Sequence, residues 1–400
     1  MKFKDFNLDS KVLEGIDAMG FDTATPVQEQ AIPIIMSGKD IIASAQTGTG
    51  KTAAFLLPVV HEIMKLPHDD SIKALIIVPT RELATQIDHQ LQGLSYFTSI
   101  SSLAVYGGGD GSGFAQEKTA LSHGADVIIG TPGRLIAHLN MGYVKLDKLS
   151  FLILDEADRM LDMGFNEDIM KIVSKLPQER QSLMFSATMP TKIRELARKL
   201  LKSPEEVNIA ISKPAERVVQ VAFSVYETQK IELTKHILKA KPLQSVIVFC
   251  STKSSAKSLN RELKKLNFLS EEIHSDLEQK EREHVLREFR NKKLNVLVAT
   301  DILARGIDIE DIELVINYDV PNDGEDYIHR IGRTARAASK GAAFTFISEA
   351  EQRKFLDIEN LLGEPVPKAK LPSAIGEGPV YNPQIRSSFK NKNRYRKSKN

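Results

Sequence analysis

Short apolar runs rich in β-branched residues recur along the first half of the chain, and each is followed by turn residues and a segment of helical periodicity. Runs of this kind predict the strands of a parallel sheet that helices cover on both faces. The expected strands of the first half are Asp40 to Ala45, Ala74 to Val78, Leu103 to Tyr106, Val127 to Ile129, Phe151 to Leu154 and Ser182 to Phe185.

The second half repeats this plan. Its expected strands are Val218 to Tyr226, Ser245 to Cys250, Asn295 to Ala299, Leu314 to Tyr318 and Ala342 to Ile347. Between the halves, Asn208 to Arg217 contains Pro214 and has neither a helical nor a strand period, which is typical of a linker. We therefore expect an α/β protein with one domain at residues 1–208, a linker at 209–217 and a second domain at 218–364.

The last part of the chain has a different composition. After Leu362 the pattern gives way to Pro, Gly, Asn and basic residues, and between Arg386 and Asn400 there is no acidic residue. A segment with so little apolar content cannot bury enough surface to fold alone. We expect residues 365–400 to form a disordered basic tail.

Composition narrows the class of protein. A chain of 400 residues is too long for one hydrophobic core, and its formal net charge of +2 means that any nucleic-acid-binding surface must be local. The single cysteine, Cys250, excludes an internal disulfide and a cysteine-based zinc site, and we expect it to be buried. No apolar stretch is long enough for a bilayer and the N-terminus lacks a signal-peptide core, so we expect a cytoplasmic protein without membrane contact.

A phosphate-binding loop is the strongest local motif. It follows the first expected strand, precedes a helical stretch, and consists of Ala45, Gln46, Thr47, Gly48, Thr49, Gly50, Lys51 and Thr52. In such a loop backbone N–H groups surround the phosphates, the lysine reaches the outer phosphates and the Thr hydroxyl ligates Mg²⁺. The match is partial because the pattern requires Gly where this chain has Ala45, and an ordinary Gly/Thr turn is the alternative.

An acidic cluster follows a later apolar strand. The run Phe151 to Leu154 ends in Asp155, Glu156, Ala157 and Asp158. Beside a phosphate-binding loop, Asp155 can hold Mg²⁺ through water and Glu156 can polarise the attacking water. An isolated cluster would more often be a solvated acidic turn, but the loop upstream favours the catalytic interpretation.

The letters of this cluster, together with further motifs in order from about Phe3 to Leu362, resemble the DEAD-box family of ATP-dependent RNA helicases. The resemblance implies two tandem RecA-like domains, each a mainly parallel sheet flanked by helices, with ATP and Mg²⁺ as cofactors. It also implies an RNA-dependent ATPase. The compact length and short tail look like the RhlE-like bacterial branch, which suggests partners in ribosome assembly or RNA turnover and a monomeric chain.

Family motifs that surround the nucleotide are present in both halves. Gly20-Phe21 and the segment Ala24 to Gln28 resemble the N-terminal adenine-reading signature, with Ala24 in place of the usual Pro. The resemblance implies that Gln28 hydrogen-bonds adenine and that Phe3, or less expectedly Phe6, stacks on it. Gly306 and Asp308 match the fifth motif, where the aspartate is directed at the ribose.

Two more motifs imply coupling between hydrolysis and movement. Ser186 and Thr188 match the third motif and are expected to bond toward Asp158, although hydroxyls at a strand end often satisfy only local backbone groups. The last motif covers His329 to Arg336, with Ala335 in place of Gly, and His329 and Arg330 are assigned to coupling. Arg333 and Arg336 are the expected arginine fingers, with a solvated basic helix as the alternative.

The remaining motifs imply contacts with the RNA backbone. In the first half they provide Pro79, Thr80, Arg81, Gly108, Thr131, Pro132, Gly133 and Arg134, and in the second half Thr252 and Thr300. Backbone contacts of this kind depend steeply on salt and little on base sequence. His274 and His329 lie near acids but lack a second histidine at ligand spacing, so Mg²⁺ is the only metal that we expect.

The resemblance to the family implies local, non-processive separation of short RNA duplexes, or remodelling of RNA–protein complexes, driven by ATP. An ATP-gated RNA clamp or assembly scaffold would carry identical motifs and stays an alternative. A DNA helicase of a sister family is disfavoured by the DEAD letters and Gln28, and a metabolic P-loop kinase or GTPase would leave the second domain unexplained. The basic tail, with Phe389 and Tyr395, is expected either to tether RNA or only to aid solubility.

Overall fold

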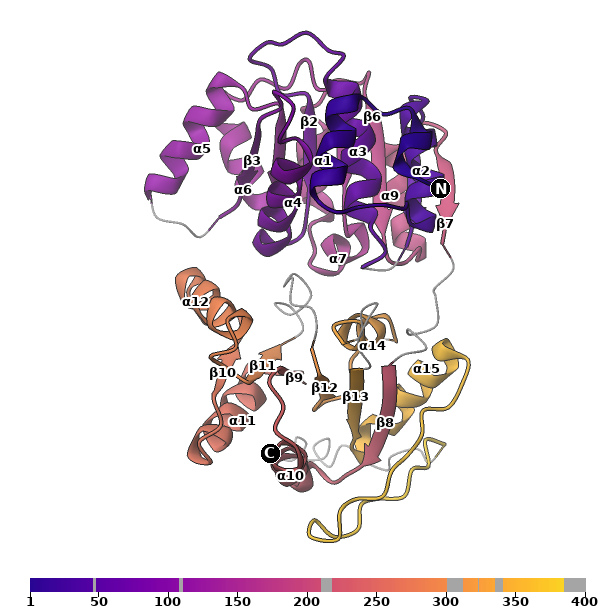
Figure 1. The fold of residues 1–400 in the computed structure, drawn as a ribbon, viewed down its shortest axis with the longest axis vertical. Coiled ribbons are helices and arrows are strands. Elements are labelled where there is room, and N and C mark those ends of the chain that lie inside the picture. The colour runs from indigo at the N-terminus through magenta and orange to yellow at the C-terminus, as the bar shows by residue number, and fades with distance from the viewer. Residues whose placement is uncertain are drawn as a thin grey trace, which may run out of the picture. The chain divides into compact units, whose positions relative to one another are not determined.

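The computed structural model of the chain describes residues 1–45, 48–107, 111–209, 218–300, 312–322, 324–334 and 341–384 (Figure 1). The chain divides into two compact units, and the division between Ser212 and Lys213 lies within the expected linker segment. No helix of the described part is long and apolar enough to cross a membrane.

The first unit contains a parallel sheet in the order β3-β4-β2-β5-β6-β1-β7. Its strands are β1 (Ile41–Ser44), β2 (Ala74–Ile77), β3 (Ser102–Val105), β4 (Val127–Gly130), β5 (Phe151–Leu154), β6 (Gln181–Ser186) and β7 (Glu205–Asn208). Every strand that an apolar run predicted is present. The edge strand β7 was not predicted.

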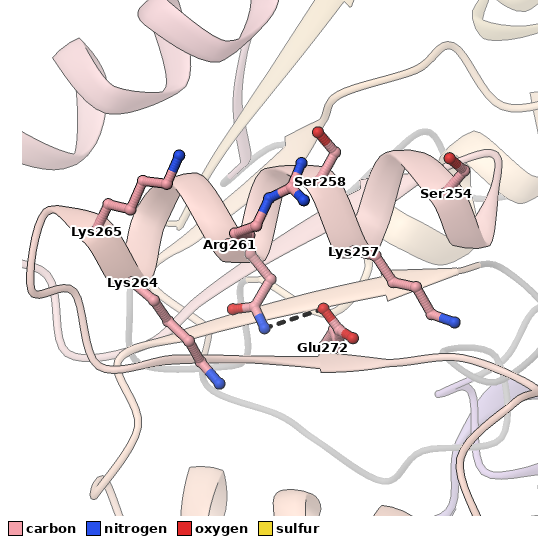
Figure 2. Close-up of a pocket in the computed structure, with 8 residues that line it drawn as sticks. Ser254, Lys257, Ser258, Arg261, Lys264, Lys265 and Glu272 are labelled. Atoms are coloured by element: carbon pink, nitrogen blue, oxygen red, sulfur yellow. Dashed lines mark hydrogen bonds between the residues drawn. The ribbon is translucent and has the colours of Figure 1, made fainter.

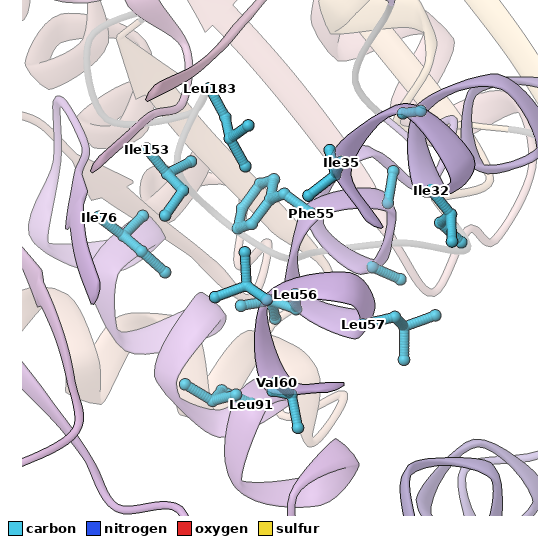
Figure 3. Close-up of a cluster of buried hydrophobic side chains, with 14 of the residues drawn as sticks. Ile32, Ile35, Phe55, Leu56, Leu57, Val60, Ile76, Leu91, Ile153 and Leu183 are labelled. Atoms are coloured by element: carbon cyan, nitrogen blue, oxygen red, sulfur yellow. The ribbon is translucent and has the colours of Figure 1, made fainter. Parts of the chain in front are cut away.

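Helices cover both faces of this sheet. They are α1 (Ser10–Ala18), α2 (Pro26–Met36), α3 (Lys51–Ile63), α4 (Arg81–Leu94), α5 (Gly111–His123), α6 (Pro132–Asn140), α7 (Ala157–Asp162), α8 (Asn166–Val173) and α9 (Thr191–Leu200). Along β1, Ile41 and Ala43 pack with α1–α4, whereas Ile42 packs into a second core with α5–α9. Figure 3 shows the first of these cores, where Phe55 of α3 packs against Ile153 and Leu183 of the sheet. Strand alternation thus gives one sheet two buried faces.

The second unit repeats the architecture with the parallel order β10-β11-β9-β12-β13-β8. Its strands are β8 (Val218–Ser224), β9 (Val246–Cys250), β10 (Ser270–Ile273), β11 (Val296–Thr300), β12 (Leu314–Asn317) and β13 (Gly341–Ile347). Its described helices are α10 (Lys230–Ala240), α11 (Lys253–Lys265), α12 (Gln279–Arg290), α14 (Gly324–Ile331) and α15 (Gln352–Leu362). Two parallel-sheet α/β units confirm the predicted fold class, and Cys250 is buried as expected.

The sequence analysis placed the start of the disordered tail too early in the chain. Instead of being disordered from residue 365, the chain packs along the second unit as far as residue 384: Ala222 and Pro367 share a backbone hydrogen bond, and Val366 is buried. Glu359 of α15 accepts hydrogen bonds from the backbone of Val366 and the hydroxyl of Tyr381, and it pairs with Lys368. Sparse apolar residues therefore suffice here because a preformed domain supplies their partners. Residues 385–400 lie outside the described part.

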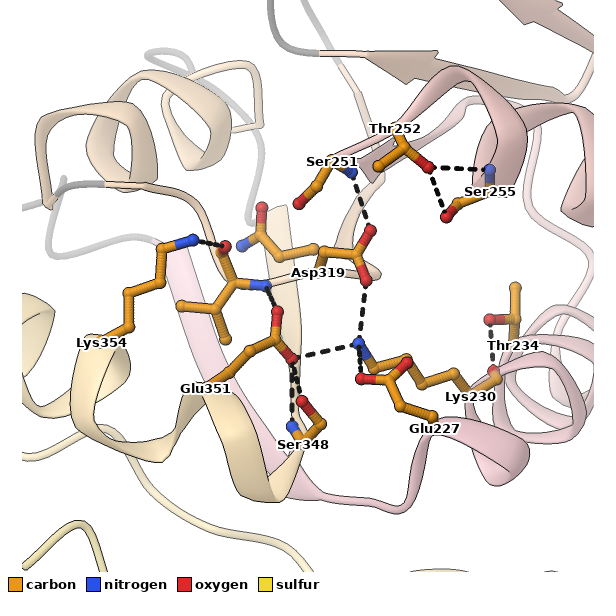
Figure 4. A network of polar contacts seen from close by, with 12 residues as sticks. Glu227, Lys230, Thr234, Ser251, Thr252, Ser255, Asp319, Ser348, Glu351 and Lys354 are labelled. Carbon is orange, nitrogen blue, oxygen red and sulfur yellow. Dashed lines mark hydrogen bonds and ion pairs between the residues drawn. The ribbon is translucent and has the colours of Figure 1, made fainter. Parts of the chain in front are cut away.

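A fully buried lysine organises one end of the second unit (Figure 4). Lys230 of α10 is 0% exposed and donates to Asp319 at 2.8 Å and Glu351 at 3.1 Å. Burial lowers the pKa of Lys230, but the carboxylates of Asp319 and Glu351 more than offset this, and the pKa lies above its ordinary value. Asp319 in turn accepts the N–H of Ser251 at 2.7 Å, next to Thr252. The lysine therefore links α10 to the ends of β9 and β12.

Lys230→Met is expected to lower the free energy of unfolding by about 3–5 kcal/mol, because it leaves Asp319 and Glu351 as uncompensated carboxylates in a buried site. Urea unfolding of the full chain measures the loss. Lys239→Met on the exposed face of the same helix is the control, and we expect it to change stability by less than about 0.5 kcal/mol. Equal effects of the two variants would contradict a special role for the buried lysine.

Candidate functional site

The predicted motifs form two groups at one edge of the first sheet, according to the strands at whose ends they lie. The phosphate-binding loop and Asp155 follow β1 and β5, and Ser186 is the last residue of β6; these three strands are neighbours in the sheet. Thr80 and Thr131 follow β2 and β4, and Gly107, the neighbour of the predicted Gly108, follows β3; these strands form the other side of the sheet. Because parallel strands end at the same edge of a sheet, the nucleotide motifs and the RNA motifs occupy neighbouring but separate parts of that edge.

Two glycines of the phosphate-binding loop have a backbone conformation that other residues rarely adopt. Gly48 and Gly50 have φ values of 79° and 88°, in the left-handed region, and a Cβ at Gly50 would lie 2.4 Å from Nε2 of Gln28. Lys51 is buried and its Nζ donates to the carbonyl of Ala45 at 2.7 Å. The ammonium group therefore lies inside the loop, where phosphate oxygens would replace the carbonyl. Gln46 and Thr47 lie outside the described residues.

Gln28 connects the N-terminal signature to this loop. Its Oε1 accepts the N–H of Thr25 at 2.9 Å, and its Nε2 donates to the carbonyl of Gly50 at 3.0 Å. Phe3 and Phe6 are both buried, with ring centroids 6.2 Å apart. The adenine contacts of Gln28 and Phe3 stay predictions, but the described bonds already make the position of Gln28 depend on the phosphate-binding loop.

The acidic cluster is buried at the end of β5. Asp155 Oδ1 accepts the N–H of Glu156 at 2.9 Å, and burial raises the pKa of Asp155 to about 6 despite the opposing charge of Lys51. Glu156 has a left-handed backbone with φ of 51°, unusual for a non-glycine residue, and its carboxylate pairs with Arg159 at 3.1 Å. Arg159 was missed by the sequence analysis, although its spacing of three residues from Glu156 on a helix could have indicated the pair.

Asp155→Asn is expected to stabilise the nucleotide-free protein by roughly 1–3 kcal/mol at pH 7.5. The pKa of Asp155 is about 6 in the folded chain against an ordinary value of 3.8, so ionisation of Asp155 costs stability. That cost is absent below about pH 4, grows between the two values and is complete above about pH 6. Thermal unfolding of both proteins from pH 4 to 8 measures it, and an advantage independent of pH would exclude this cause.

Asp158 joins the acidic cluster to the third motif. Its Oδ2 accepts the backbone N–H groups of Ala187 and Thr188, both at 3.0 Å, and its own N–H donates to Oγ of Ser186 at 3.3 Å. The expected contact between these motifs is therefore made mostly through backbone amides of the segment, and Ser186 supplies the one hydroxyl contact. A shift of Asp158 would displace residues 186–188 through these bonds.

The threonines assigned to RNA stand where helices begin. Thr80, Thr131 and Thr252 are the N-cap residues of α4, α6 and α11. Thr80 Oγ1 accepts the N–H of Leu83 at 3.3 Å, and Thr252 Oγ1 accepts the N–H of Ser255 at 3.0 Å. Each therefore precedes a helix N-terminus, which favours phosphate oxygens.

The other residues assigned to RNA have less uniform surroundings. Thr300 ends β11 and is 6% exposed. Gly133 has room for a larger side chain, whereas Arg134 pairs with Glu117 at 2.6 Å. Pro79, Arg81 and Pro132 flank the same helix starts. Gly108 lies outside the described residues.

In the second unit, Arg330 is an internal residue. It is 2% exposed, donates to Oδ1 of Asn317 at 3.1 Å and to the carbonyl of Asp319 at 2.8 Å, and lies over the ring of Phe249. Arg333 is half-buried in the turn after α14. His329 is the last-but-two residue of that helix, and Gly306, Asp308 and Arg336 lie outside the described residues.

A hollow of about 800 Å³ along α11 carries none of the predicted site residues (Figure 2). Lys257, Lys264 and Lys265 line it, but each pairs with a carboxylate of Asp276, Glu271 or Glu262. These three lysines are thus engaged in ion pairs.

Comparisons with known proteins match both halves of the chain. Residues 25–196 match the DEAD/DEAH box helicase family and residues 229–338 match the helicase conserved C-terminal domain. The chain is 44% identical to an ATP-dependent RNA helicase CshA of Listeria monocytogenes over 88% of this chain and 66% of that protein. It is 41% identical to the DEAD-box ATP-dependent RNA helicase CshA of Bacillus subtilis over 93% and 74%.

Solved structures agree in fold. Saccharomyces cerevisiae Dbp5 bound to RNA and ADP BeF3 is similar with a TM-score of 0.82, 31% identity, and coverage of 92% of this chain and 95% of that one. Mss116p bound to ssRNA and AMP-PNP is similar with a TM-score of 0.82, 29% identity, and coverage of 93% and 80%.

Proposed function

The chain belongs to the DEAD-box family of ATP-dependent RNA helicases, and we propose that it couples RNA-stimulated ATP hydrolysis to local, non-processive separation of short RNA duplexes or to remodelling of RNA–protein complexes. The observation that carries this proposal is the sorting of motifs along one sheet edge. The nucleotide loop, Asp155 and Ser186 lie at the ends of the adjacent strands β1, β5 and β6, and the RNA-assigned loops follow the neighbouring strands β2, β3 and β4.

The residues at the end of β5 and the start of α3 suit Mg²⁺. Asp155 is a buried carboxylate whose pKa burial raises to about 6 despite the charge of Lys51, and a cation bound beside it would lower the cost of its ionisation. In the described part of the chain no group of three His, Cys, Asp or Glu side chains is placed to hold a metal. In the proposed site, Thr52 and Asp155 would hold Mg²⁺ together with phosphate oxygens and water, and the ion would neutralise phosphate charge.

In this mechanism the protein supplies positioning and charge. Lys51 stabilises the outer phosphates, Glu156 orients and polarises the attacking water, and Arg333 and Arg336 complete the site from the second domain. Asp158 passes the change at the nucleotide to the segment 186–188 through its three bonds. ATP and RNA, bound by both domains together, favour a closed state in which the RNA strand is bent and loses its complement.

The finer assignments belong to the same proposal. We place the protein in the cytoplasm as a monomer that contacts RNA mainly through its backbone, with proteins of ribosome assembly or RNA turnover as partners. The RhlE-like branch stays a prediction from length and tail.

Steady-state ATP hydrolysis with no nucleic acid, with single-stranded RNA and with DNA of the same sequence tests the proposal. Stimulation by RNA alone is the expected result. Equal stimulation by DNA would favour a DNA helicase of a sister family. No stimulation by either would favour a clamp that partner proteins activate, and a duplex-unwinding assay with RNA separates these outcomes further.

A further inference from the structure

A buried polar cluster lies where α5 and α6 meet in the first unit. Phe114 and Glu117 are three residues apart on α5, and Arg134 and His138 are four residues apart on α6, so each pair occupies one helix face. Glu117 is 9% exposed, His138 is 1% exposed, and the side chain of Arg134 is 15% exposed. We call these four residues the Glu117 cluster; among them only Arg134 was singled out by the sequence.

One carboxylate oxygen holds both residues of α6. Oε2 of Glu117 accepts from Nε of Arg134 at 2.6 Å and bonds Nε2 of His138 at 2.8 Å. The Phe114 ring stacks on His138, with centroids 4.3 Å apart and planes 15° apart, and lies 4.4 Å from Cζ of Arg134. The hydroxyl of Tyr143 bonds the other nitrogen of His138. Since the Phe114 ring covers the ion pair between Glu117 and Arg134, water screens it little.

The other carboxylate oxygen reaches a different loop. Oε1 of Glu117 accepts the backbone N–H of Tyr106 at 3.3 Å. Tyr106 follows β3 directly and precedes Gly107, whereas Arg134 lies in the first turn of α6, just after the N-cap Thr131. A single side chain thus fixes the spacing between two loops that, in the proposed function, receive consecutive parts of one RNA backbone.

We propose that Glu117 is a positioning residue for RNA binding. Its carboxylate sets the distance between the Tyr106–Gly107 loop and the start of α6. Its bond to Nε of Arg134 fixes the orientation of the first turn of α6. This inference rests on the proposed function, because the two loops need a fixed spacing only if phosphates of one strand bind both. Phe114 acts with Glu117 by excluding water from the ion pair. His138 acts by forming a second hydrogen bond with the same carboxylate oxygen of Glu117.

Glu117→Ala is expected to raise the KM for single-stranded RNA by about tenfold or more, the loss of charge-assisted hydrogen bonds from a shielded site. The kcat at saturating RNA and the KM for ATP should change less than about twofold, because the nucleotide motifs follow other strands. Glu117→Gln keeps the volume and one acceptor, so an intermediate rise of about threefold is expected. Gln116→Ala, on the exposed face of α5, is the matched control.

A double-mutant cycle separates positioning from loss of the fold. Because Glu117 acts partly through Arg134, Glu117→Gln combined with Arg134→Gln should raise the RNA KM by clearly less than the product of the two single effects. Additive effects would overturn the proposal. So would a folded Glu117→Ala protein with the wild-type RNA KM, or an equal loss in RNA KM, ATP KM and kcat. If the wild-type protein itself shows no RNA stimulation, the proposed function fails first, and this inference fails with it.

Discussion

Replacing Glu156 by glutamine is expected to lower kcat for RNA-stimulated ATP hydrolysis by about 10²–10⁴-fold, while ATP still binds. The side chain follows the buried Asp155 on a left-handed backbone and is fixed by Arg159 at 3.1 Å. Glutamine keeps the shape and one bond to Arg159, but its amide does not polarise water as a carboxylate does. Single-turnover hydrolysis and equilibrium binding of a fluorescent ATP analogue measure the two effects separately.

The control for this variant is Glu167→Gln, an exposed glutamate in the first turn of α8. We expect the control to retain wild-type rates. A Glu156→Gln protein that hydrolyses ATP within tenfold of the wild type would remove Glu156 from the catalytic set. Weakened ATP binding together with a lowered unfolding temperature would instead identify the ion pair with Arg159 as a support of the fold.

Apolar runs predicted the interior strands well because those strands are buried on both faces and carry no compensating polar residues. The two strands that were missed have other surroundings. β7 reads Glu205 to Asn208 and β10 reads Ser270 to Ile273, and both lie at sheet edges, where glutamates can face water. Their sequences contain no apolar run, so only the pairing partner, β1 or β11, determines that they are strands.

The candidate site shows the same limit. Motif spacing located Lys51, Asp155 and Asp158, because the phosphate-binding loop and the acidic cluster are written in consecutive residues. Lys230 and Glu117 could not be found in this way. On their helices they look like solvated charges, and their partners are 89 residues away in Asp319 and 17 residues away in Arg134. Burial of a charge is decided by tertiary packing, which local patterns do not contain.

Arg333→Ala is expected to lower kcat for RNA-stimulated hydrolysis by about 10³–10⁵-fold, the range attributed to arginine fingers in phosphoryl transfer. The two arginines on the described part of this motif have different surroundings. Arg330 is 2% exposed and holds Asn317 and Asp319, whereas Arg333 is half-buried in the turn after α14. Arg330→Ala should therefore act mainly by destabilising the fold, whereas the loss of rate in Arg333→Ala should exceed what any change in its unfolding transition explains.

The measurement that distinguishes these roles is steady-state hydrolysis at saturating ATP and RNA, combined with urea unfolding of the same preparations. Arg353→Ala on α15, an exposed arginine of the same unit, controls for loss of positive charge and should keep the wild-type rate. Arg333→Lys tests geometry, since a lysine keeps the charge but loses the planar fork that can bond two phosphate oxygens. A lysine variant with the wild-type kcat would mean that charge alone is required. An alanine variant with the wild-type kcat would exclude Arg333 as the arginine finger. Arg336 would then be the remaining candidate for that role in the second domain.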